Sequence, residues 1–287
     1  MNVAVVGANG FLGKSLVKFL LKKNIDVSAF SRKPIGLNCN WLEYTISSIS
    51  DLSCFKEYDF VFYCAACGVQ SKSNTNIIEI TEVNLLFPIR LSSFLRNTKV
   101  RLVTFGSYFE IGDSDSNKEW IEEEIIYSRN SFTGNYILTK KAFSYFNYIS
   151  KSTIHFILPT IYGEYEDENR IIPYLINNLK NGLEVHVSKG EQIRQYIYVN
   201  DLIFCLWSVL NEPIENNVYN APYAETFKIK DIIYMIACHF RSKQLVKIKG
   251  EFKDNSMKIL KIKSSEIFLK HNFNFIKLND NLDVYFN

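Results

Sequence analysis

Short apolar runs alternate with segments of helical periodicity through the first half of the chain. The helical segments are Lys14–Lys22, Asn84–Leu95 and Asn135 to about Lys151. The apolar runs have the length and composition of strands buried on both faces; they are Val3–Val6, Val27–Phe30, Phe60–Cys64, Leu102–Phe105 and His155–Leu158. This alternation predicts an α/β fold with a doubly wound parallel sheet.

The pattern changes after Gly163. An acidic, polar loop from Glu164 to Arg170 leads into a helix expected near Ile172–Asn181, and later segments are shorter and more polar. We therefore predict a smaller, mixed α/β C-terminal lobe. The strand Tyr196–Val199 and the helix Asp201–Leu210 are expected to return to the first sheet. The predicted division is a first domain over 1–162, joined by about 196–221, and a second lobe over 163–195 and 222–287.

Three glycines spaced three residues apart separate the first apolar run from the first helical segment. Gly7, Gly10 and Gly13 permit a tight turn, and they keep side chains away from the start of the helix. An anionic diphosphate can approach a helix N-terminus only where side chains are absent. The loop therefore indicates a nucleotide site, without saying which nucleotide.

Composition and charge narrow the possible functions. The 287 residues are 47% hydrophobic and 22% charged, with a net charge of +3. This balance gives no electrostatic support for a nucleic-acid or membrane-surface partner. No long uncharged apolar stretch and no signal-peptide pattern is present, so a cytoplasmic location is expected. Cys64 and Cys67 have metal-site spacing, but no second pair accompanies them, so no metal site is expected.

Candidate chemistry comes from a phenol, an amine and a hydroxyl. Tyr136 and Lys140 are four residues apart on an expected helix and so share one face. A nearby cation stabilises a phenolate, so Lys140 is expected to lower the pKa of Tyr136. Ser107 follows the run Leu102–Phe105 and would emerge at the carboxyl edge of the sheet, where α/β proteins bind ligands. Taken alone, the Tyr-Lys pair is more typical of a helix surface in a chain this rich in tyrosine and lysine.

Together, these motifs resemble the extended short-chain dehydrogenase/reductase family and its nucleotide-sugar epimerases, dehydratases and 4-ketoreductases. The resemblance is greatest to the bacterial dTDP-4-keto-6-deoxyglucose reductases and the CDP-abequose and CDP-paratose synthases. The family's motifs match this chain at the glycine loop, at Asn84, at the turn Tyr162–Gly163 and in the segment Gly190–Asp201. The resemblance implies a Rossmann-like fold, a nicotinamide cofactor in the first domain, and a C-terminal lobe that binds the nucleotide-sugar substrate.

The resemblance also implies roles for individual residues. Tyr136 would be the acid or base on a sugar oxygen, Ser107 would hold that oxygen, and Lys140 would bind the nicotinamide ribose. Arg194 would neutralise the substrate diphosphate; a solvated surface arginine is its alternative. Further expected substrate contacts are Ser107, Tyr108 and Asn169. The expected cofactor contacts are Gly7, Asn9, Gly10, Phe11, Leu12, Gly13, Ser31, Arg32, Cys64, Ala65, Ala66, Tyr136 and Lys140.

The residues after the second strand bear on the choice of cofactor. Members that bind NAD carry an acidic residue there for the ribose 2′-hydroxyl, whereas this chain has Ser31, Arg32 and Lys33. A hydroxyl and two cations fit a 2′-phosphate, so NADP(H) is expected; stacking of Arg32 on adenine is the alternative. Cys64 is expected to pack beneath the cofactor.

The sequence lacks catalytic residues that some enzymes of the resembling family carry, and this narrows the set of expected reactions. Tyr108 and Phe109 stand where the 4,6-dehydratases carry an Asp-Glu pair, and Phe109 replaces the cysteine of the GDP-fucose epimerase-reductases. We therefore expect NADPH-dependent reduction of a nucleotide-linked 4-keto-6-deoxyhexose in O-antigen or surface-polysaccharide synthesis. An NAD-dependent 4-epimerase is the alternative, and an NADP-binding redox regulator without turnover is a third reading. The family also implies a homodimer through the Tyr136 and Asn84 helices.

Overall fold

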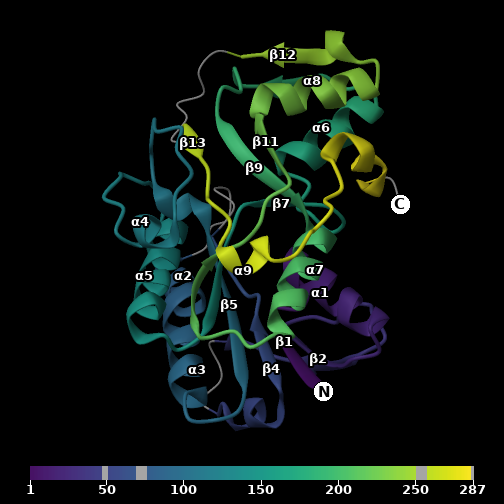
Figure 1. Cartoon of the computed structure of the whole chain (residues 1–287). Helices are drawn as coiled ribbons and strands as arrows, with labels where there is room; N and C mark the ends of the chain where they lie inside the picture. Colours follow the sequence, from purple (N-terminus) through teal and green to yellow (C-terminus); the bar gives the residue numbers. More distant parts are fainter. Residues whose placement is uncertain (47–50, 69–75, 250–256, 286–287) are drawn as a thin grey trace.

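The apolar runs of the first half of the chain form one parallel sheet in the computed structural model (Figure 1). The model describes residues 1–46, 51–68, 76–249 and 257–285. The strands lie in the order β10-β6-β5-β4-β1-β2-β3, and every adjacent pair is parallel. Their bounds are β1 Asn2–Val6, β2 Asp26–Ser31, β3 Asn40–Glu43, β4 Phe60–Tyr63, β5 Arg101–Ser107, β6 Ile154–Leu158 and β10 Asn217–Asn220. The predicted doubly wound, Rossmann-like α/β fold is confirmed.

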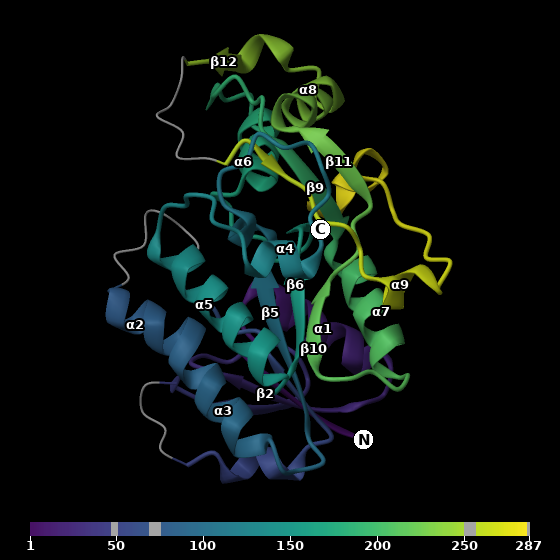
Figure 2. The same cartoon turned by 60° about the vertical axis from the view of Figure 1, so that its left-hand side comes forward.

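Helices cover both faces of this sheet (Figure 2). On one face, α1 (Phe11–Lys22) packs against α7 (Val199–Leu210). On the other face lie α2 (Ile77–Thr81), α3 (Phe87–Leu95) and α5 (Asn135–Ser150). The chain passes from β1 to one side of the sheet and returns on the other side at β4. The carboxyl ends of β1 and β4 therefore flank the switch point at which such folds bind ligands.

The predicted helix over Asn84–Leu95 begins with an irregular turn. Glu82–Leu86 (η3) forms a π-helical turn that leads into α3. Pro88 has no backbone N–H and cannot donate an ordinary helical hydrogen bond to Asn84. The wider turn buries Asn84, whose side-chain amide donates to the Cys67 carbonyl at 3.0 Å and to Thr139 Oγ1 at 3.1 Å. Asn84 thereby ties the loop after β4 to α5.

The second half of the chain builds smaller sheets above the first. Strand β9 (Ile193–Tyr198) pairs with β11 (Glu225–Lys228), β13 (Ile259–Leu260) and β7 (Thr160–Tyr162). Strand β8 (Val185–Val187) pairs with β12 (Val246–Ile248). The remaining elements are α4 Glu122–Ile126, α6 Ile171–Lys180, α8 Ile229–His239, α9 Glu266–Leu269 and the short 3-10 turns η2 Ser53–Glu57, η4 Tyr108–Ile111, η5 Lys243–Leu245 and η6 Leu278–Tyr285.

The placement of Tyr196–Val199 in the first sheet is wrong. These residues belong to β9 and α7, and β9 pairs with β7 and β11 rather than with any strand of the large sheet. Five of the six β9 residues are buried, so its apolar pattern does not indicate which sheet it joins. The strand that does return is β10, parallel to β6. The division into two lobes stays a prediction, and its residues 47–50, 69–75, 250–256 and 286–287 lie outside the described residues.

Helix length and hydropathy decide whether a helix can cross a membrane. Within the described residues, every helix is too short or too polar to cross a bilayer.

Candidate active site

A large cleft of about 2050 Å³ opens at the carboxyl ends of β1, β4 and β5, between the large sheet and the β9 sheet. Most of the residues predicted to bind cofactor or substrate line it; they are Gly7, Asn9, Gly10, Phe11, Leu12, Ser31, Arg32, Cys64, Ala65, Ala66, Ser107, Tyr136, Lys140 and Arg194. The cleft does not include three of the predicted contacts, namely Gly13, Tyr108 and Asn169.

The glycine loop forms a cradle that larger residues would fill. Gly7 adopts a φ of +82°, and a Cβ there would lie 2.5 Å from the backbone nitrogen of Ala65. A Cβ on Gly13 would lie 2.3 Å from the Gly7 carbonyl oxygen, so Gly13 serves the packing of helix on loop. Gly10 is the N-cap of α1 and has no side chain to cap the helix. The open N-terminal amide groups of α1 fit the diphosphate of a dinucleotide.

The end of β2 combines a fixed hydroxyl with exposed cations. The Ser31 hydroxyl donates to the Lys33 carbonyl at 2.6 Å and accepts from Trp41 Nε1 at 3.1 Å. The Arg32 side chain is 76% exposed, and its nearest recorded partner is Glu79 at 3.9 Å. Ser31, Arg32 and Lys33 all line the cleft. This edge of the cleft therefore offers positive charge where NAD-binding relatives offer a carboxylate.

The structure brings Ser107, Tyr136 and Lys140 together, and we call this cluster the candidate triad. Ser107 is the last residue of β5 and the N-cap of η4. Tyr136 lies in the first turn of α5 and lines the cleft with Ser107, whose side chain favours the ionised form of the phenol. Lys140, one turn later, is buried and donates from Nζ to the Phe105 carbonyl at 2.8 Å.

The expected depression of the Tyr136 pKa by Lys140 is contradicted. The pKa of Tyr136 is raised to about 12, first by burial and then by the Glu110 carboxyl, against the opposing effects of Ser107 and Arg170. Burial also lowers the pKa of Lys140 to about 8. The Lys140 ammonium is held at the Phe105 carbonyl, and it is not among the groups that shift Tyr136. At neutral pH the Tyr136 phenol therefore keeps its proton and can act as an acid.

The predicted substrate contacts differ in whether they reach the cleft and in what they contact. Arg194 on β9 lines the cleft, but its guanidinium donates to the backbone carbonyls of Ile193 at 2.8 Å and Met257 at 2.5 Å. Tyr108 is fully buried, and its hydroxyl hydrogen-bonds to Thr160 Oγ1 at 2.6 Å. Asn169 is exposed and donates to Asp167. These contacts leave Arg194 as the predicted substrate residue that both carries charge and reaches the cleft.

Two residues that the sequence did not predict belong to this region: Arg170 lines the cleft, and Glu110 is buried beneath it. Arg170, one position after Asn169, lines the cleft and pairs with Glu166 at 3.1 Å. Glu110 lies beneath the candidate triad and accepts the Ser107 backbone N–H at 2.7 Å. The spacing Ser107-Tyr-Phe-Glu110 is that of a capping box, which could have identified Glu110. The sequence gives no comparable signal for Arg170.

The cysteines are all free thiols. Cys64 and Cys67 both line the cleft, and burial raises the pKa of each, to about 11 for Cys67. Among the described residues, no group of three or more His, Cys, Asp and Glu side chains is arranged to hold a metal ion. The two thiols near the cleft are therefore protonated at neutral pH and poorly nucleophilic.

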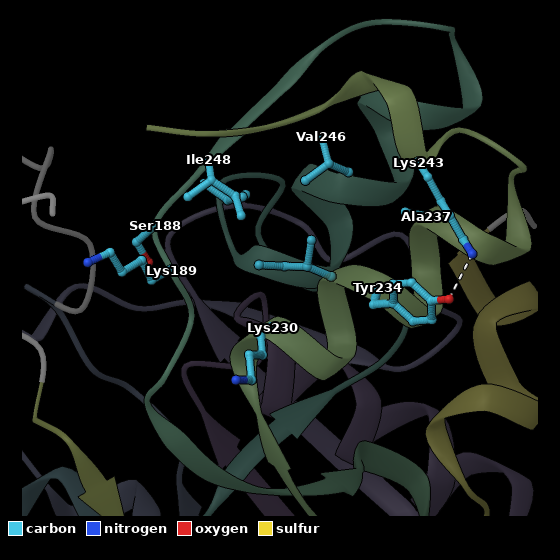
Figure 3. Close-up of a pocket in the computed structure, with 10 residues that line it drawn as sticks. Ser188, Lys189, Lys230, Tyr234, Ala237, Lys243, Val246 and Ile248 are labelled. Carbon is cyan, nitrogen blue, oxygen red and sulfur yellow. Dashed lines mark hydrogen bonds between the residues drawn. The ribbon is translucent and has the colours of Figure 1, made fainter. Parts of the chain in front are cut away.

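A second cavity, of about 280 Å³, lies between α8, β8 and β12 (Figure 3). Its lining includes the apolar side chains of Val187, Ile233 and Ala237. Lys243 at its rim donates to the Tyr234 hydroxyl at 2.7 Å. This cavity shares no lining residue with the large cleft.

Comparisons with known proteins agree with the geometry. The profile of the NAD dependent epimerase/dehydratase family matches residues 3–221. The CDP-abequose synthase of Salmonella typhimurium is 27% identical over 226 residues, which cover 72% of this chain and 69% of that protein. The CDP-abequose synthase of Yersinia pseudotuberculosis is 23% identical, and the match covers 90% of this chain and 87% of that protein. The dTDP-4-dehydro-6-deoxyglucose reductase of Escherichia coli is 20% identical, and the match covers 90% of this chain and 88% of that protein.

Solved structures show the same fold at lower sequence identity. The UDP-glucuronic acid 4-epimerase from Bacillus cereus, in complex with UDP-glucuronic acid and NAD, superposes with a TM-score of 0.86 at 17% identity and covers 100% of this chain and 98% of that one. The dTDP-glucose 4,6-dehydratase from Bacillus anthracis, in complex with NAD, gives a TM-score of 0.84 at 16% identity, with 99% and 96% covered.

Proposed function

The chain belongs to the NAD dependent epimerase/dehydratase family, and on this premise we propose that it is an NADPH-dependent nucleotide-sugar 4-ketoreductase. Its substrate would be a dTDP- or CDP-linked 4-keto-6-deoxyhexose, and its product a deoxysugar donor for a bacterial surface polysaccharide such as O-antigen. The observation that carries the proposal is the candidate triad, in which a protonated phenol faces the cleft beside a serine hydroxyl. Relatives named as CDP-abequose synthases and as a dTDP-4-dehydro-6-deoxyglucose reductase support this substrate class.

In this proposal the cleft residues bind the cofactor along the carboxyl edge of the sheet. The glycine loop and the α1 N-terminus receive the diphosphate, and Ser31 and Arg32 receive a 2′-phosphate. Lys140 reaches toward the nicotinamide ribose from α5. When bound, NADPH supplies the hydride that the C4 carbon accepts.

The candidate triad binds and protonates the oxygen of the C4 carbonyl group. The Ser107 hydroxyl donates a hydrogen bond to the C4 oxygen, and Tyr136 transfers its phenolic proton to that oxygen as the carbon accepts hydride. The ketone thus gains one hydride and one proton and becomes an alcohol. Arg170 and Arg194 are the guanidinium groups that line the cleft where the sugar diphosphate would lie, and they bring positive charge from two different elements.

An NAD-dependent 4-epimerase would use the same triad, and several solved neighbours hold NAD. The cations at the end of β2 favour NADPH for this chain. A regulator that binds NADP without turnover would have no use for the pairing of Tyr136 with Ser107. An epimerase is expected to retain NAD through purification and to consume no added reductant.

The test is loss of NADPH absorbance when the protein meets dTDP- or CDP-4-keto-6-deoxyglucose, each made in place by its own 4,6-dehydratase. Rapid oxidation with one substrate is expected and identifies the nucleotide. Tyr136→Phe is expected to lower kcat by about a thousandfold, because the proton donor is lost, while the Kd for NADPH changes by less than about threefold. Unchanged turnover in Tyr136→Phe, or no oxidation with either substrate, would contradict the proposal.

We also propose a homodimer in which α5 and the η3–α3 segment of one copy pack on those of another. The exposed apolar side chains on these elements support it and include Leu86, Leu138, Tyr145 and Ile149.

A further inference from the structure

A buried carboxyl group lies directly beneath the candidate triad. Glu110 has no exposed surface, and its Oε1 accepts the Ser107 backbone N–H at 2.7 Å. In return, Ser107 Oγ accepts the Phe109 backbone N–H at 3.3 Å, which completes a reciprocal capping box. Glu110 Oε2 has no hydrogen-bond partner among the described residues. Burial of an acidic group with one unpaired oxygen is costly, so its retention points to a role beyond capping a single turn.

The surroundings of Glu110 are built to keep it in place. A Cβ on Gly106 would lie 2.7 Å from Glu110 Oε1 and 2.7 Å from His155 Nε2, so only glycine leaves room for the carboxyl group. The Ser144 hydroxyl hydrogen-bonds to His155 Nε2 at 2.9 Å, and it opposes the rise in the pKa of the Glu110 carboxyl. His155 Nδ1 lies 2.8 Å from Thr104 Oγ1, and burial lowers the pKa of His155 to about 3. The support is therefore a chain of neutral groups.

We propose that Glu110 is a positioning residue for the candidate triad, fixing Ser107 through its backbone and disfavouring negative charge on the Tyr136 phenol. This inference rests on the proposed function for its catalytic meaning. It assigns Glu110 no contact with substrate. Its effect is to hold Tyr136 in the protonated form that a reductase needs at the start of each turnover.

The charged and polar groups around this site act in a consistent direction. Burial raises the pKa of Glu110, and the groups that favour its ionised form are Ser144, the Ser107 N–H, Lys140 and Lys141. Tyr136 in turn is affected by Glu110, Ser107 and Arg170. Because Glu110 also raises the pKa of Lys140, removing its charge should make both the phenol and the ammonium lose their protons at lower pH.

The test separates the charge of Glu110 from its hydrogen bond. Glu110→Gln keeps an oxygen that can accept the Ser107 N–H, whereas Glu110→Ala removes both charge and acceptor. In Glu110→Gln, the alkaline limb of the kcat profile for ketone reduction is expected to move down by about one pH unit. Glu110→Ala should show the same shift with a further loss of kcat of roughly tenfold, because Ser107 is no longer fixed.

Glu124→Gln is the matched control. Glu124 Oε2 accepts the Ile121 backbone N–H at 3.2 Å in the same position of a helical turn, but its side chain is 38% exposed and lies outside the cleft. The control should leave the pH profile unmoved. A uniform fall in kcat with unmoved limbs in Glu110→Gln would show a merely structural role and overturn the inference.

A second measurement does not depend on turnover. In protein carrying tyrosine labelled with ¹³C at Cζ, the Tyr136 signal is assigned by its absence in Tyr136→Phe, and its titration is followed by NMR. Tyr136 should begin to ionise at lower pH in Glu110→Gln and, by a smaller amount, in Ser144→Ala, which keeps the carboxyl group. Unchanged titration in both variants overturns the inference. A shift in titration without ketone reduction would support Glu110 and reject the proposed reaction.

Discussion

Cofactor choice is decided by one or two side chains at the end of β2. Arg32 is exposed beside the cleft, with its nearest carboxylate 3.9 Å away, so its charge is available to a 2′-phosphate. Arg32→Ala should raise the Kd for NADPH about tenfold or more, because a charge-assisted hydrogen bond contributes roughly 1.5–3 kcal/mol. The Kd for NADH should change by less than about threefold. Fluorescence titration of both cofactors measures the ratio.

A matched control keeps this result specific. Arg96→Ala removes the same charge from a residue just after α3 that does not line the cleft. The control should leave both dissociation constants unchanged. An equal loss of NADPH and NADH affinity in Arg32→Ala would indicate stacking on adenine instead of phosphate recognition.

Lys140 makes stability depend on pH in a predictable direction. Its pKa of about 8 in the folded protein lies below the ordinary value of about 10.4. Below pH 8 the amine is charged in both states and its burial cost is fully present. Between pH 8 and about 10.4 the unfolded chain binds more protons, so this group's contribution to stability rises with pH, by up to about 1.4 kcal/mol per unit.

Lys140→Met removes that dependence. In urea unfolding, the free energy of unfolding of the variant should exceed that of the wild type by most near pH 7. This difference in free energy should become smaller between pH 8 and pH 10. Lys22→Met, on the exposed end of α1, reports the effect of the substitution itself. A difference between wild type and Lys140→Met that is constant from pH 7 to pH 10 would contradict the shifted pKa.

Local spacing predicted which residues meet at the site, but long-range contacts set their properties. The glycine loop and the Tyr136–Lys140 pair follow from helix and turn geometry, which depends on residues a few positions apart. The raised pKa of Tyr136 depends on Glu110, which is brought beneath it by the packing of η4 against α5. Arg170, and not the predicted Asn169, lines the cleft, and a sequence does not fix a helix boundary to one residue.

At the scale of elements, the loop between β7 and α6 is held by the C-terminal turn. The Glu166 side chain is 2% exposed and accepts from Arg170 Nε at 3.1 Å and from the Tyr285 hydroxyl. The Tyr285 oxygen also accepts the Gly163 backbone N–H at 3.0 Å. These contacts connect η6 to the loop that ends at Arg170, whose side chain lines the cleft.

Tyr285→Phe should loosen this loop without touching the candidate triad. Loss of the hydroxyl leaves Glu166 with Arg170 and a long hydrogen bond from the Gly163 N–H at 3.4 Å. A less ordered Arg170 should raise the KM for the sugar nucleotide about three- to tenfold at nearly constant kcat. Steady-state kinetics measure both constants. Tyr234→Phe, which removes a hydroxyl at the remote cavity, should change neither constant. A fall in kcat with unchanged KM in Tyr285→Phe would contradict the positioning of Arg170.

Element types were predictable where the apolar pattern is periodic, and element partners were less so. The strands β1, β2, β4, β5 and β6 match their apolar runs to within about two residues. Strand β9 has the same kind of run, yet it joins a different sheet because the chain leaves the large sheet after β6 and forms β7 beside it. Burial on both faces looks alike in either sheet, so sequence periodicity could not distinguish them.

At the scale of the whole molecule, two contacts connect the loop after β7 to helix α1 on the large sheet. Lys18 on α1 pairs with Glu164, and the Lys14 ammonium lies 4.7 Å from the centre of the Tyr165 ring. Both partners belong to the loop that carries Arg170. Groups expected to bind cofactor and groups expected to bind substrate line one cleft, as hydride transfer between two ligands requires.

The outer surface of the molecule also carries an apolar stripe on α5. Leu138, Tyr145 and Ile149 are 50%, 47% and 60% exposed, with Ala142 between them, at the i, i+4, i+7 and i+11 spacing of one helix face. The neighbouring η3 turn adds Leu86, which is 46% exposed. A contiguous stripe of this kind is costly in water and typical of a helix that packs against a partner.

We therefore expect a dimer in sedimentation at micromolar concentration, and Tyr145→Arg should weaken it at least about thirtyfold, because a charge would be buried in an apolar contact. Leu183→Arg, at a residue 54% exposed after α6, is the matched control and should remain dimeric. Lys140 and Asn84 already anchor α5 within one chain. The Tyr145→Arg monomer should consequently keep its kcat within about threefold, and a wild-type monomer at tens of micromolar would reject the interface.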